Sequence, residues 1–242
     1  MHFRMATYNI HRCIGRDGKA SPQRVAEVLR AIDADVVALQ EVAYDPTRPG
    51  DVLQFLAEAA GAEAVAGPTL LEAKGRYGNA LLTRTPPRSV RRVDISVPGR
   101  EPRGILQVTL ELPWGPVSVL TTHLGLSIEE RRRQMDWIVT MLKQTESETL
   151  IVMGDFNEWL PWGRPLRRVA TVCDAPDFPA PATFPSRRPF LALDRIWVRS
   201  DRPLTSLRVF KESPAPMASD HLPLVADLDL EQCPGSVEPH RP

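Results

Sequence analysis

The segment RGILQVTLELPWGPVSVLTTHL, residues 103–124, predicts an antiparallel β-hairpin. Between residues 105 and 112 the side chains alternate with the period of two that is typical of a half-buried strand. Residues 113–116, which include two prolines and a glycine, form the expected turn to a second apolar strand. Two strands joined by so short a turn run antiparallel, so this hairpin excludes a purely parallel sheet.

Helices are expected between the strands. Ser21 and Pro22 form a typical helix start, and apolar residues follow with helical spacing up to position 32. Ser127 and Glu130 form a capping box before a second periodic segment, and residues 51–60 predict another helix. Further strands are expected at FRMATYN (3–9), DVVALQ (35–40), YGNALLTR (77–84), LIVM (150–153), LDRIWV (193–198) and LPLVADLDL (222–230). The proline-rich and arginine-rich segment 160–190 is expected to be irregular.

We expect one large domain over residues 1–230, followed by a flexible tail over residues 231–242. No repeat of fixed period and no break in composition divides the 242 residues, and the last segment has little to pack. A hydrophobic content of 43% and a charged content of 25% are typical of a soluble globular protein. No stretch approaches the roughly 20 apolar residues of a membrane helix, so no transmembrane segment is expected.

The cysteines and the first residues favour a cytoplasmic location. Three widely spaced cysteines without a CxxC pair argue against a disulfide framework and against a cysteine-bound zinc site. The N-terminal residues lack the basic and apolar regions of a signal peptide. The 30 basic and 30 acidic residues balance to a net charge of zero. This balance weighs against nucleic acid as a partner, although a local basic patch is compatible with it. A monomer is the expected state.

Polar side chains stand at the ends of the predicted strands. They are Asn9, Glu41, His123, Asp155 and Asn157, with Asp194, Asp220 and His221 at the beginnings of strands. Functional groups collect at the loops and strand ends that a rigid scaffold presents. The set is rich in oxygen ligands and contains no thiolate, so it suits Mg²⁺ or Mn²⁺ better than zinc.

Each of these residues alone also has a structural interpretation. Asn9 can close a turn, and Asp155 can form an Asx turn. Glu41 can cap a helix, and Asp194 can pair with Arg195. The functional interpretation therefore depends on the whole set.

Seven short stretches occur in one order along the chain: TYNI, ALQEV, YGNALLTR, TTHLG, GDFNEW, LDRIWV and SDHLPLVADL. In these stretches the chain resembles the endonuclease/exonuclease/phosphatase superfamily of metal-dependent phosphoesterases over nearly its whole length. The resemblance implies an α+β fold, a four-layer α/β/β/α sandwich of two mixed β-sheets flanked by helices, with the active site at one end. It also implies a Mg²⁺-dependent phosphodiesterase in which Mn²⁺ can substitute.

By this resemblance, Glu41 is the principal metal ligand, Asn9 lies beside it, and Asp220 lies near the metal. Magnesium keeps several waters and takes one or two carboxylates from a protein, so Glu41 and one aspartate satisfy it.

The resemblance also implies the catalytic roles. Asp155 orients and deprotonates the attacking water, and Asn157 holds the phosphate or a metal-bound oxygen. His123 and His221 contact the phosphate, and Asp194 accepts a hydrogen bond from His221. Attack on a phosphoester builds negative charge, which a metal ion and two imidazoles can neutralise. Which carboxylate is the general base stays open.

Arg103, Asn79 and His11 are further candidates for substrate contacts, and exposed or structural roles fit their positions equally well. The run RRR at 131–133 is expected on a solvated helix face, whereas SRRP at 186–189 is expected in a loop that can contact phosphate. The expected substrate is a small or lipid-headgroup phosphodiester. A DNA-repair-type endonuclease or exonuclease is the alternative, and a non-catalytic binding module of the same fold is a third, which would be expected to have lost ligand positions.

Overall fold

The computed structural model of the chain describes residues 2–72, 75–160, 164–174 and 180–231. Within these residues two β-sheets pack face to face. The first sheet has the order β10-β11-β1-β2-β4-β3 and the second has the order β5-β6-β7-β8-β9. The first sheet comprises β1 (His2–Asn9), β2 (Val36–Tyr44), β3 (Glu63–Glu72), β4 (Gly75–Thr83), β10 (Leu204–Val209) and β11 (Leu224–Asp229). The second comprises β5 (Pro87–Asp94), β6 (Gly104–Leu112), β7 (Gly115–His123), β8 (Thr149–Asp155) and β9 (Asp194–Arg199).

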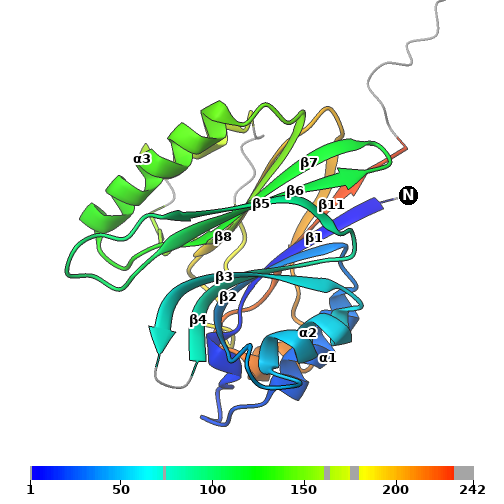
Figure 1. Cartoon of the computed structure of the whole chain (residues 1–242), viewed down its shortest axis with the longest axis vertical. Helices are drawn as coiled ribbons and strands as arrows, with labels where there is room; N and C mark the ends of the chain where they lie inside the picture. Colours follow the sequence, from blue (N-terminus) through cyan, green and yellow to red (C-terminus); the bar gives the residue numbers. More distant parts are fainter. Residues whose placement is uncertain (1, 73–74, 161–163, 175–179, 232–242) are drawn as a thin grey trace, which may run out of the picture.

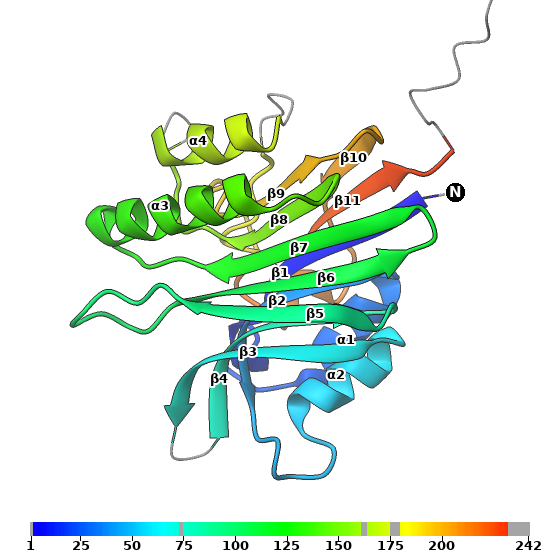
Figure 2. The ribbon, with the colours of Figure 1, turned by 45° about the horizontal axis from the view of Figure 1, so that its top comes forward.

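Helices cover both outer faces of the sandwich (Figures 1 and 2). The helices over the first sheet are α1 (Pro22–Ile32) and α2 (Val52–Ala60), and those over the second are α3 (Ile128–Gln144) and α4 (Arg164–Val172). A short 3₁₀ turn (His11–Cys13) and helix α5 (Ala215–Ala218) lie in the loops. Three apolar clusters fill the layers between α1, α2 and the first sheet, between the two sheets, and between the second sheet and α3, α4. The predicted four-layer α+β sandwich is confirmed.

Both sheets are mixed. β1 and β2 run parallel in the first sheet, as do β7 and β8 in the second, and the remaining strand pairs are antiparallel. The hairpin predicted over residues 103–124 is the β6–β7 pair, in which Leu112 lies opposite Gly115. The predicted helix starts are also present, because the side chains of Ser21 and Ser127 accept hydrogen bonds from the backbone N–H groups of Arg24 and Glu130.

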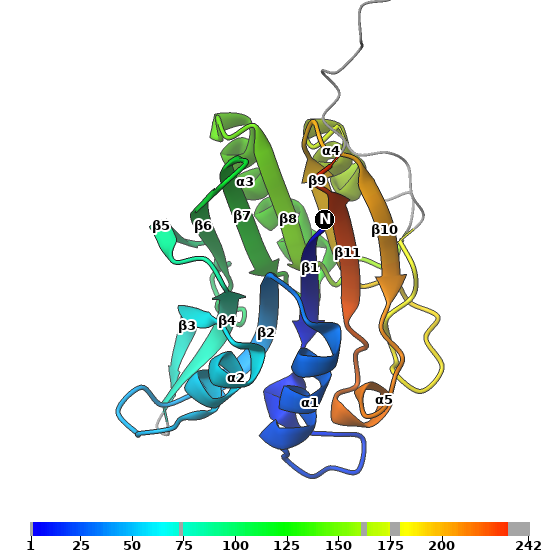
Figure 3. The same cartoon turned by 90° about the vertical axis from the view of Figure 1, so that its right-hand side faces the viewer.

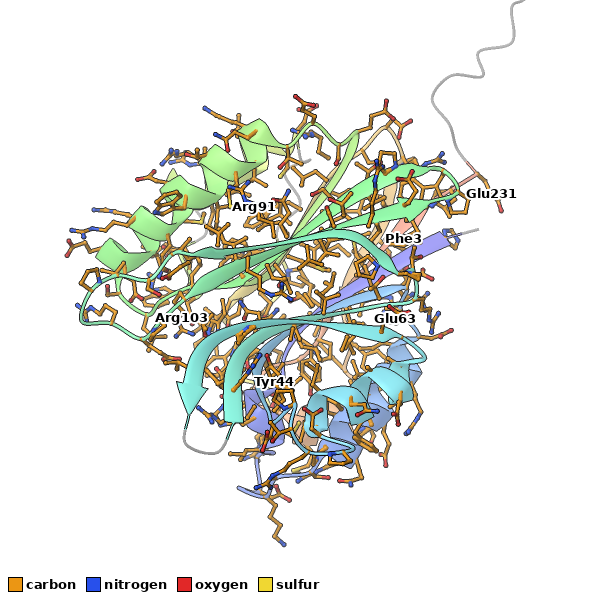
Figure 4. The ribbon with its side chains drawn as sticks, viewed as in Figure 1. Phe3, Tyr44, Glu63, Arg91, Arg103 and Glu231 are labelled. Atoms are coloured by element: carbon orange, nitrogen blue, oxygen red, sulfur yellow. The ribbon has the colours of Figure 1, made fainter. Side chains whose placement is uncertain are left out.

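The topology gathers one end of several strands together. β1, β7 and β8 finish at this end, and β9 and β11 begin there because each runs antiparallel to its neighbour. In Figure 3 the start of β1 is marked N, and helix α5 lies beyond the opposite end of this strand. In the side-chain view, Arg103 lies at this end and Glu231 at the other (Figure 4).

Two expectations about strands and irregular segments differ from the structure. The segment expected to be irregular contains α4, whose second residue is Pro165. Proline is tolerated in a first helical turn because its missing N–H would have no partner there. Glu41, expected at a strand end, lies inside β2 at a β-bulge between Leu39 and Val42.

No helix in the described ranges is long and apolar enough to cross a membrane. The described strands and helices lie within the predicted domain 1–230, whereas residues 232–242 of the predicted tail are outside the described residues.

Candidate active site

Asp155 is the centre of the polar groups at the strand ends. It is the last residue of β8 and is 1% exposed. Its Oδ1 accepts a hydrogen bond from the backbone N–H of Asn157 at 2.9 Å, as in an Asx turn. Its Oδ2 accepts one from Asn9 Nδ2 at 3.0 Å and also faces Nε2 of His123 at 3.5 Å and Nε2 of His221 at 3.7 Å. One carboxylate oxygen therefore meets an amide and two imidazoles.

Gly154 explains how β8 brings Asp155 to this position. Its φ angle is +153°, and a Cβ at this residue would lie 2.1 Å from the carbonyl oxygen of Thr122 on β7. Only glycine permits this close approach of the two strands. In the resulting register, Asp155 lies opposite His123 of β7 and opposite Asp194 of β9.

His221 and Asp194 form a buried pair. Nδ1 of His221 lies 2.9 Å from Oδ2 of Asp194, which also accepts a hydrogen bond from Thr183 Oγ1 at 2.5 Å. Oδ1 of Asp194 has no hydrogen-bond partner among the described residues. The ring of Phe184 packs 4.9 Å from the His221 ring. The hydrogen bond predicted between these two residues is therefore present, whereas Arg195 donates to the backbone carbonyl oxygens of Asp194 and Glu158.

Ser219 connects the His221 loop to β1. Its hydroxyl donates to the carbonyl oxygen of Asn9 at 2.7 Å and accepts from the backbone N–H of His221 at 3.2 Å. This hydroxyl joins residues more than 200 positions apart in the chain, a role that was not predicted from the sequence. Its place directly before Asp220 and His221 is the signal that could have identified it. Thr183 lies in a proline-rich segment that offers no such signal.

His123 lies between the guanidinium group of Arg103 and the side-chain amide of Asn157. Arg103 Nη1 donates to Nδ1 of His123 at 3.1 Å, and Asn157 Nδ2 lies 3.1 Å from its Nε2. Asn157 Nδ2 also donates to the carbonyl oxygen of Leu124 at 2.9 Å. Asn157 has a φ angle of 49°, in the left-handed region that asparagine tolerates better than most residues.

The pKa values of the two imidazoles are shifted in opposite directions. Burial lowers the pKa of His123 to about 3, and the positive charge of Arg103 adds to this effect against the opposing charge of Asp155. Burial also lowers the pKa of His221, but the charges of Asp194 and Asp155 outweigh it and raise this pKa to about 10. At neutral pH the site therefore holds one neutral and one protonated imidazole.

A more open group of residues lies beside Asn9. Asn9 Nδ2 donates to Glu41 Oε1 at 3.0 Å, and Asn9 Oδ1 accepts from the backbone N–H of His11. Nδ1 of His11 lies 3.4 Å from Glu41 Oε2 and 3.8 Å from Asp220 Oδ1. The side chain of Glu41 is 20% exposed and that of Asp220 is 40% exposed. Glu41 has a φ angle of 58°, so the bulge in β2 turns this carboxylate out of the regular alternation of the strand.

The remaining candidates for substrate contact differ in position. Arg103 is 6% exposed, pairs with Glu101 at 3.2 Å, and lines a cavity of about 520 Å³ together with Arg92 and Ser96. Asn79 is buried, and its Nδ2 donates to the carbonyl oxygen of Gly104 at 3.2 Å. Asn79 thus ties β4 to β6 across the two sheets, next to Arg103.

Arg131 is not on a solvated helix face, contrary to the sequence-based expectation. It is 1% exposed, and its Nε pairs with Glu158 Oε2 at 3.3 Å. Its Nη1 donates to the carbonyl oxygens of Gly125 and Leu126 at 3.4 and 2.6 Å. Arg131 therefore joins the loop that follows His123 to the loop that follows Asn157. The sequence gives no sign of this burial, because Arg131 is cationic and is followed directly by the exposed Arg132 and Arg133.

Two stacked mixed sheets flanked by helices, with carboxylate, amide and imidazole groups gathered at one end, define the fold class of the protein. Comparison with known proteins identifies the family. The family model described as "Endonuclease/Exonuclease/phosphatase family" matches residues 6–221. The chain belongs to this family.

The chain is also similar to individual proteins and solved structures. An Escherichia coli K12 protein described as "Uncharacterized protein YbhP" is 30% identical over 94% of this chain and 96% of its own length. An endonuclease/exonuclease/phosphatase from Beutenbergia cavernae is similar with a TM-score of 0.75 and 24% identity, over 94% of this chain and 71% of that one. A mannosyl-6-phosphatase from Bacteroides thetaiotaomicron is similar with a TM-score of 0.76 and 18% identity, over 94% of this chain and 99% of that one. At these identities, the two solved structures support the fold alone.

Proposed function

We propose that the protein is a divalent-metal-dependent phosphoesterase that hydrolyses a phosphodiester bond in a small or lipid-headgroup substrate. The observation that carries this proposal is the position of Asp155 Oδ2 between Asn9, His123 and His221. A carboxylate oxygen surrounded by hydrogen-bonding groups can orient a water and accept its proton, and such general base catalysis contributes about 10²–10⁴-fold.

The histidines complement the charge that develops during attack. Protonated His221, held by Asp194, presents a positive charge to a phosphoryl oxygen, and Nε2 of His123 faces the same Asp155 oxygen as Nε2 of His221. Asn157 lies against His123 and keeps it in place. These contacts support the roles that the family resemblance implies for these residues.

The donor set of the site fits a divalent ion in two places. Asp155, Asp194 and His221 offer ligand atoms within 4.8 Å of one another, but the facing atoms of Asp194 and His221 already bond to each other. Glu41 and Asp220 are more open and offer oxygen ligands beside the Asn9 amide. Magnesium prefers oxygen ligands and retains several waters, so we assign it to Glu41 and Asp220, with Asn9 beside them; Mn²⁺ suits the same donors. A divalent ion at this position would supply charge neutralisation to the phosphoryl group.

Hydrolysis of a bis-aryl phosphodiester tests the proposal. We expect chelator to abolish hydrolysis, Mg²⁺ or Mn²⁺ to restore it, and Asp155→Asn to remain inactive under all conditions. The Asp155→Asn variant is the matched control because it preserves the shape of the side chain and excludes a contaminating enzyme. An aryl phosphomonoester should be a poorer substrate, and a preference for it over the diester would contradict the phosphodiesterase assignment.

A DNA-repair-type nuclease is the second candidate function. The observation that favours it is the exposure of Arg187 and Arg188 in the loop before β9, because arginines bind nucleic-acid phosphates. Abasic and nicked DNA therefore belong in the same substrate screen as phospholipids and nucleotides.

A further inference from the structure

Large apolar side chains are exposed mainly around the site. In the described ranges they are Leu126, Ile128, Trp137, Trp159, Leu160, Phe190 and Met217. Except for Trp137, these residues lie in loops, in the first turn of α3 (Ile128) or in the short helix α5 (Met217). These loops and helices are at the end of the sandwich where β7 and β8 finish and β9 and β11 begin. We call these residues, without Trp137, the apolar rim.

The apolar rim adjoins the candidate catalytic residues along the chain. Leu126 follows His123 by three positions, and Trp159 follows Asn157 by two. Phe190 donates its backbone N–H to the carbonyl oxygen of Phe184, whose ring packs against His221. The rim residues therefore belong to the loops that follow or precede the candidate catalytic residues.

Polar contacts of Arg131 and Glu158 hold three of the rim residues. The guanidinium carbon of Arg131 lies 4.9 Å from the centre of the Trp159 ring. Arg131 Nη1 binds the Leu126 carbonyl oxygen, and Glu158 Oε1 accepts from the backbone N–H of Leu160 at 3.1 Å. These contacts anchor the two loops that carry Leu126, Trp159 and Leu160.

Positive charge accompanies the rim. Arg187 and Arg188 are exposed beside Phe190 and form no ion pair with any described residue. On the α3 side, the exposed carboxylate of Glu129 is engaged by Arg133 at 2.8 Å. Aromatic and aliphatic side chains combined with arginine match the interface of a bilayer that carries anionic headgroups.

We propose that the apolar rim docks on a lipid surface that carries anionic headgroups and presents the site to that surface. The rim consists of separate side chains on several loops around the site. A bilayer can receive each of them independently, whereas a protein partner would need a complementary pocket for each. Docking on lipid does not require catalysis. Its effect on substrate choice rests on the proposed function, because a docked enzyme would select lipid-headgroup phosphodiesters.

Vesicle flotation tests the docking with chelated full-length protein, so that hydrolysis plays no part. The probes are vesicles of phosphatidylcholine alone and of phosphatidylcholine mixed with phosphatidylglycerol. We expect the wild type to float with the mixed vesicles and the double variant Leu126→Ser/Phe190→Ser to bind about tenfold or more weakly, because it loses two large inserting side chains. The double variant Arg187→Gln/Arg188→Gln should lose the preference for phosphatidylglycerol and become insensitive to salt.

Trp137→Ser is the matched control. Trp137 is as exposed as the rim residues but lies in the middle of α3, about 14 Å along the helix from its start, and its loss should leave flotation unchanged. The Leu126→Ser/Phe190→Ser and Trp137→Ser variants should hydrolyse a soluble aryl phosphodiester like the wild type, which shows that the site is folded. For Arg187→Gln/Arg188→Gln, an unchanged thermal midpoint shows that the protein is folded.

Three results would overturn the docking. They are absence of wild-type flotation, equal flotation of the wild type and the Leu126→Ser/Phe190→Ser variant, and self-association or DNA binding that this variant abolishes in place of vesicle binding. If the wild type floats but hydrolyses no phosphodiester with added metal, the docking stands and the proposed function fails.

Discussion

Glu41 shows how a single residue departs from its strand to serve the site. It lies within β2, yet its φ angle of 58° and the bulge between Leu39 and Val42 direct its carboxylate to Asn9 and His11. A positive φ at a residue other than glycine costs about 1 kcal/mol or more, so the surrounding structure must impose it. Such positions gather at functional sites.

Glu41→Gln should weaken metal binding and lower kcat by about 100-fold or more, because the amide lacks the charge that attracts the ion. The shape of the side chain is preserved, so the bulge and the thermal midpoint should change little. Calorimetric titration with Mg²⁺ and Mn²⁺, alongside kcat, measures both effects. Full activity of the chelated wild type would remove the basis of this prediction.

Asp194 and His221 should behave as one unit. We expect the double variant Asp194→Ala/His221→Ala to lose little more activity than His221→Ala alone, because Asp194 acts through His221. The substitutions should also lower the free energy of unfolding, because both side chains are buried and His221→Ala leaves Asp194 without its imidazole partner. Measuring kcat and the free energy of unfolding for the complete cycle separates the two effects. Strictly additive losses in kcat would show that the residues act independently.

At the scale of elements, Arg131 joins α3 to the loops after β7 and β8. Arg131→Met should lower the free energy of unfolding by about 3–5 kcal/mol, because Glu158 is 5% exposed and would keep a buried charge without its partner. Arg131→Met combined with Glu158→Gln should recover much of this loss. Denaturant unfolding measures the change, and Arg132→Met, at the exposed neighbouring position, should stay within about 0.5 kcal/mol. Equal effects at positions 131 and 132 would contradict the joining role.

A carboxylate on β11 ties three strands of the first sheet together at a distance from the site. Asp227 accepts from Arg4 Nε of β1 at 2.7 Å and from Ser206 Oγ of β10 at 2.7 Å. Burial raises the pKa of Asp227, but the hydrogen bonds and charges of its partners outweigh this and lower it overall.

Because the folded-state pKa of Asp227 is lowered, its stabilising contribution is present above the unfolded value of about 4 and is lost as pH falls through the folded value. Asp227→Asn should therefore lower stability by about 1–2 kcal/mol at neutral pH, and the difference from the wild type should shrink below about pH 4. Unfolding midpoints across a pH series test this. A difference that stays constant down to strongly acid pH would assign the effect to packing.

Elements with strong local patterns could be predicted from the sequence. A capping serine and the helical spacing of apolar residues predict α1 and α3, and the alternation of apolar and polar residues predicts the β6–β7 hairpin. β5 was not predicted, because its sequence PRSVRRVD has mostly exposed side chains and its pairing with β6 comes from the neighbour. The same limit applies to the site. Motif residues such as Asp155 and His221 were recognisable, whereas the buried state of Arg131 and the contact of Thr183 depend on tertiary packing.

At the scale of the whole molecule, the balance of 30 basic and 30 acidic residues predicts weak binding to long duplex DNA at physiological salt. Affinity of this kind comes from cationic side chains that displace counterions, and several arginines here are paired with carboxylates. Binding of Asp155→Asn protein to a long duplex, with Ca²⁺ in place of Mg²⁺ and across a salt series, measures it. Submicromolar affinity at about 0.15 M salt with a steep salt dependence would favour the nuclease alternative over the small or lipid-headgroup substrate.

The position of β1 between β2 and β11 has a consequence for synthesis. Among the described strands β1 leaves the ribosome before the others, yet one of its edges pairs with β11 (residues 224–229), which follows all of them. Contacts between such distant parts of a chain form slowly, because a large loop must close before they are made. The loop that carries Asp220 and His221 comes immediately before β11, so a nascent chain holding Asn9 and Glu41 still lacks their counterparts. The candidate site is therefore incomplete in the growing polypeptide until β11 has docked beside β1.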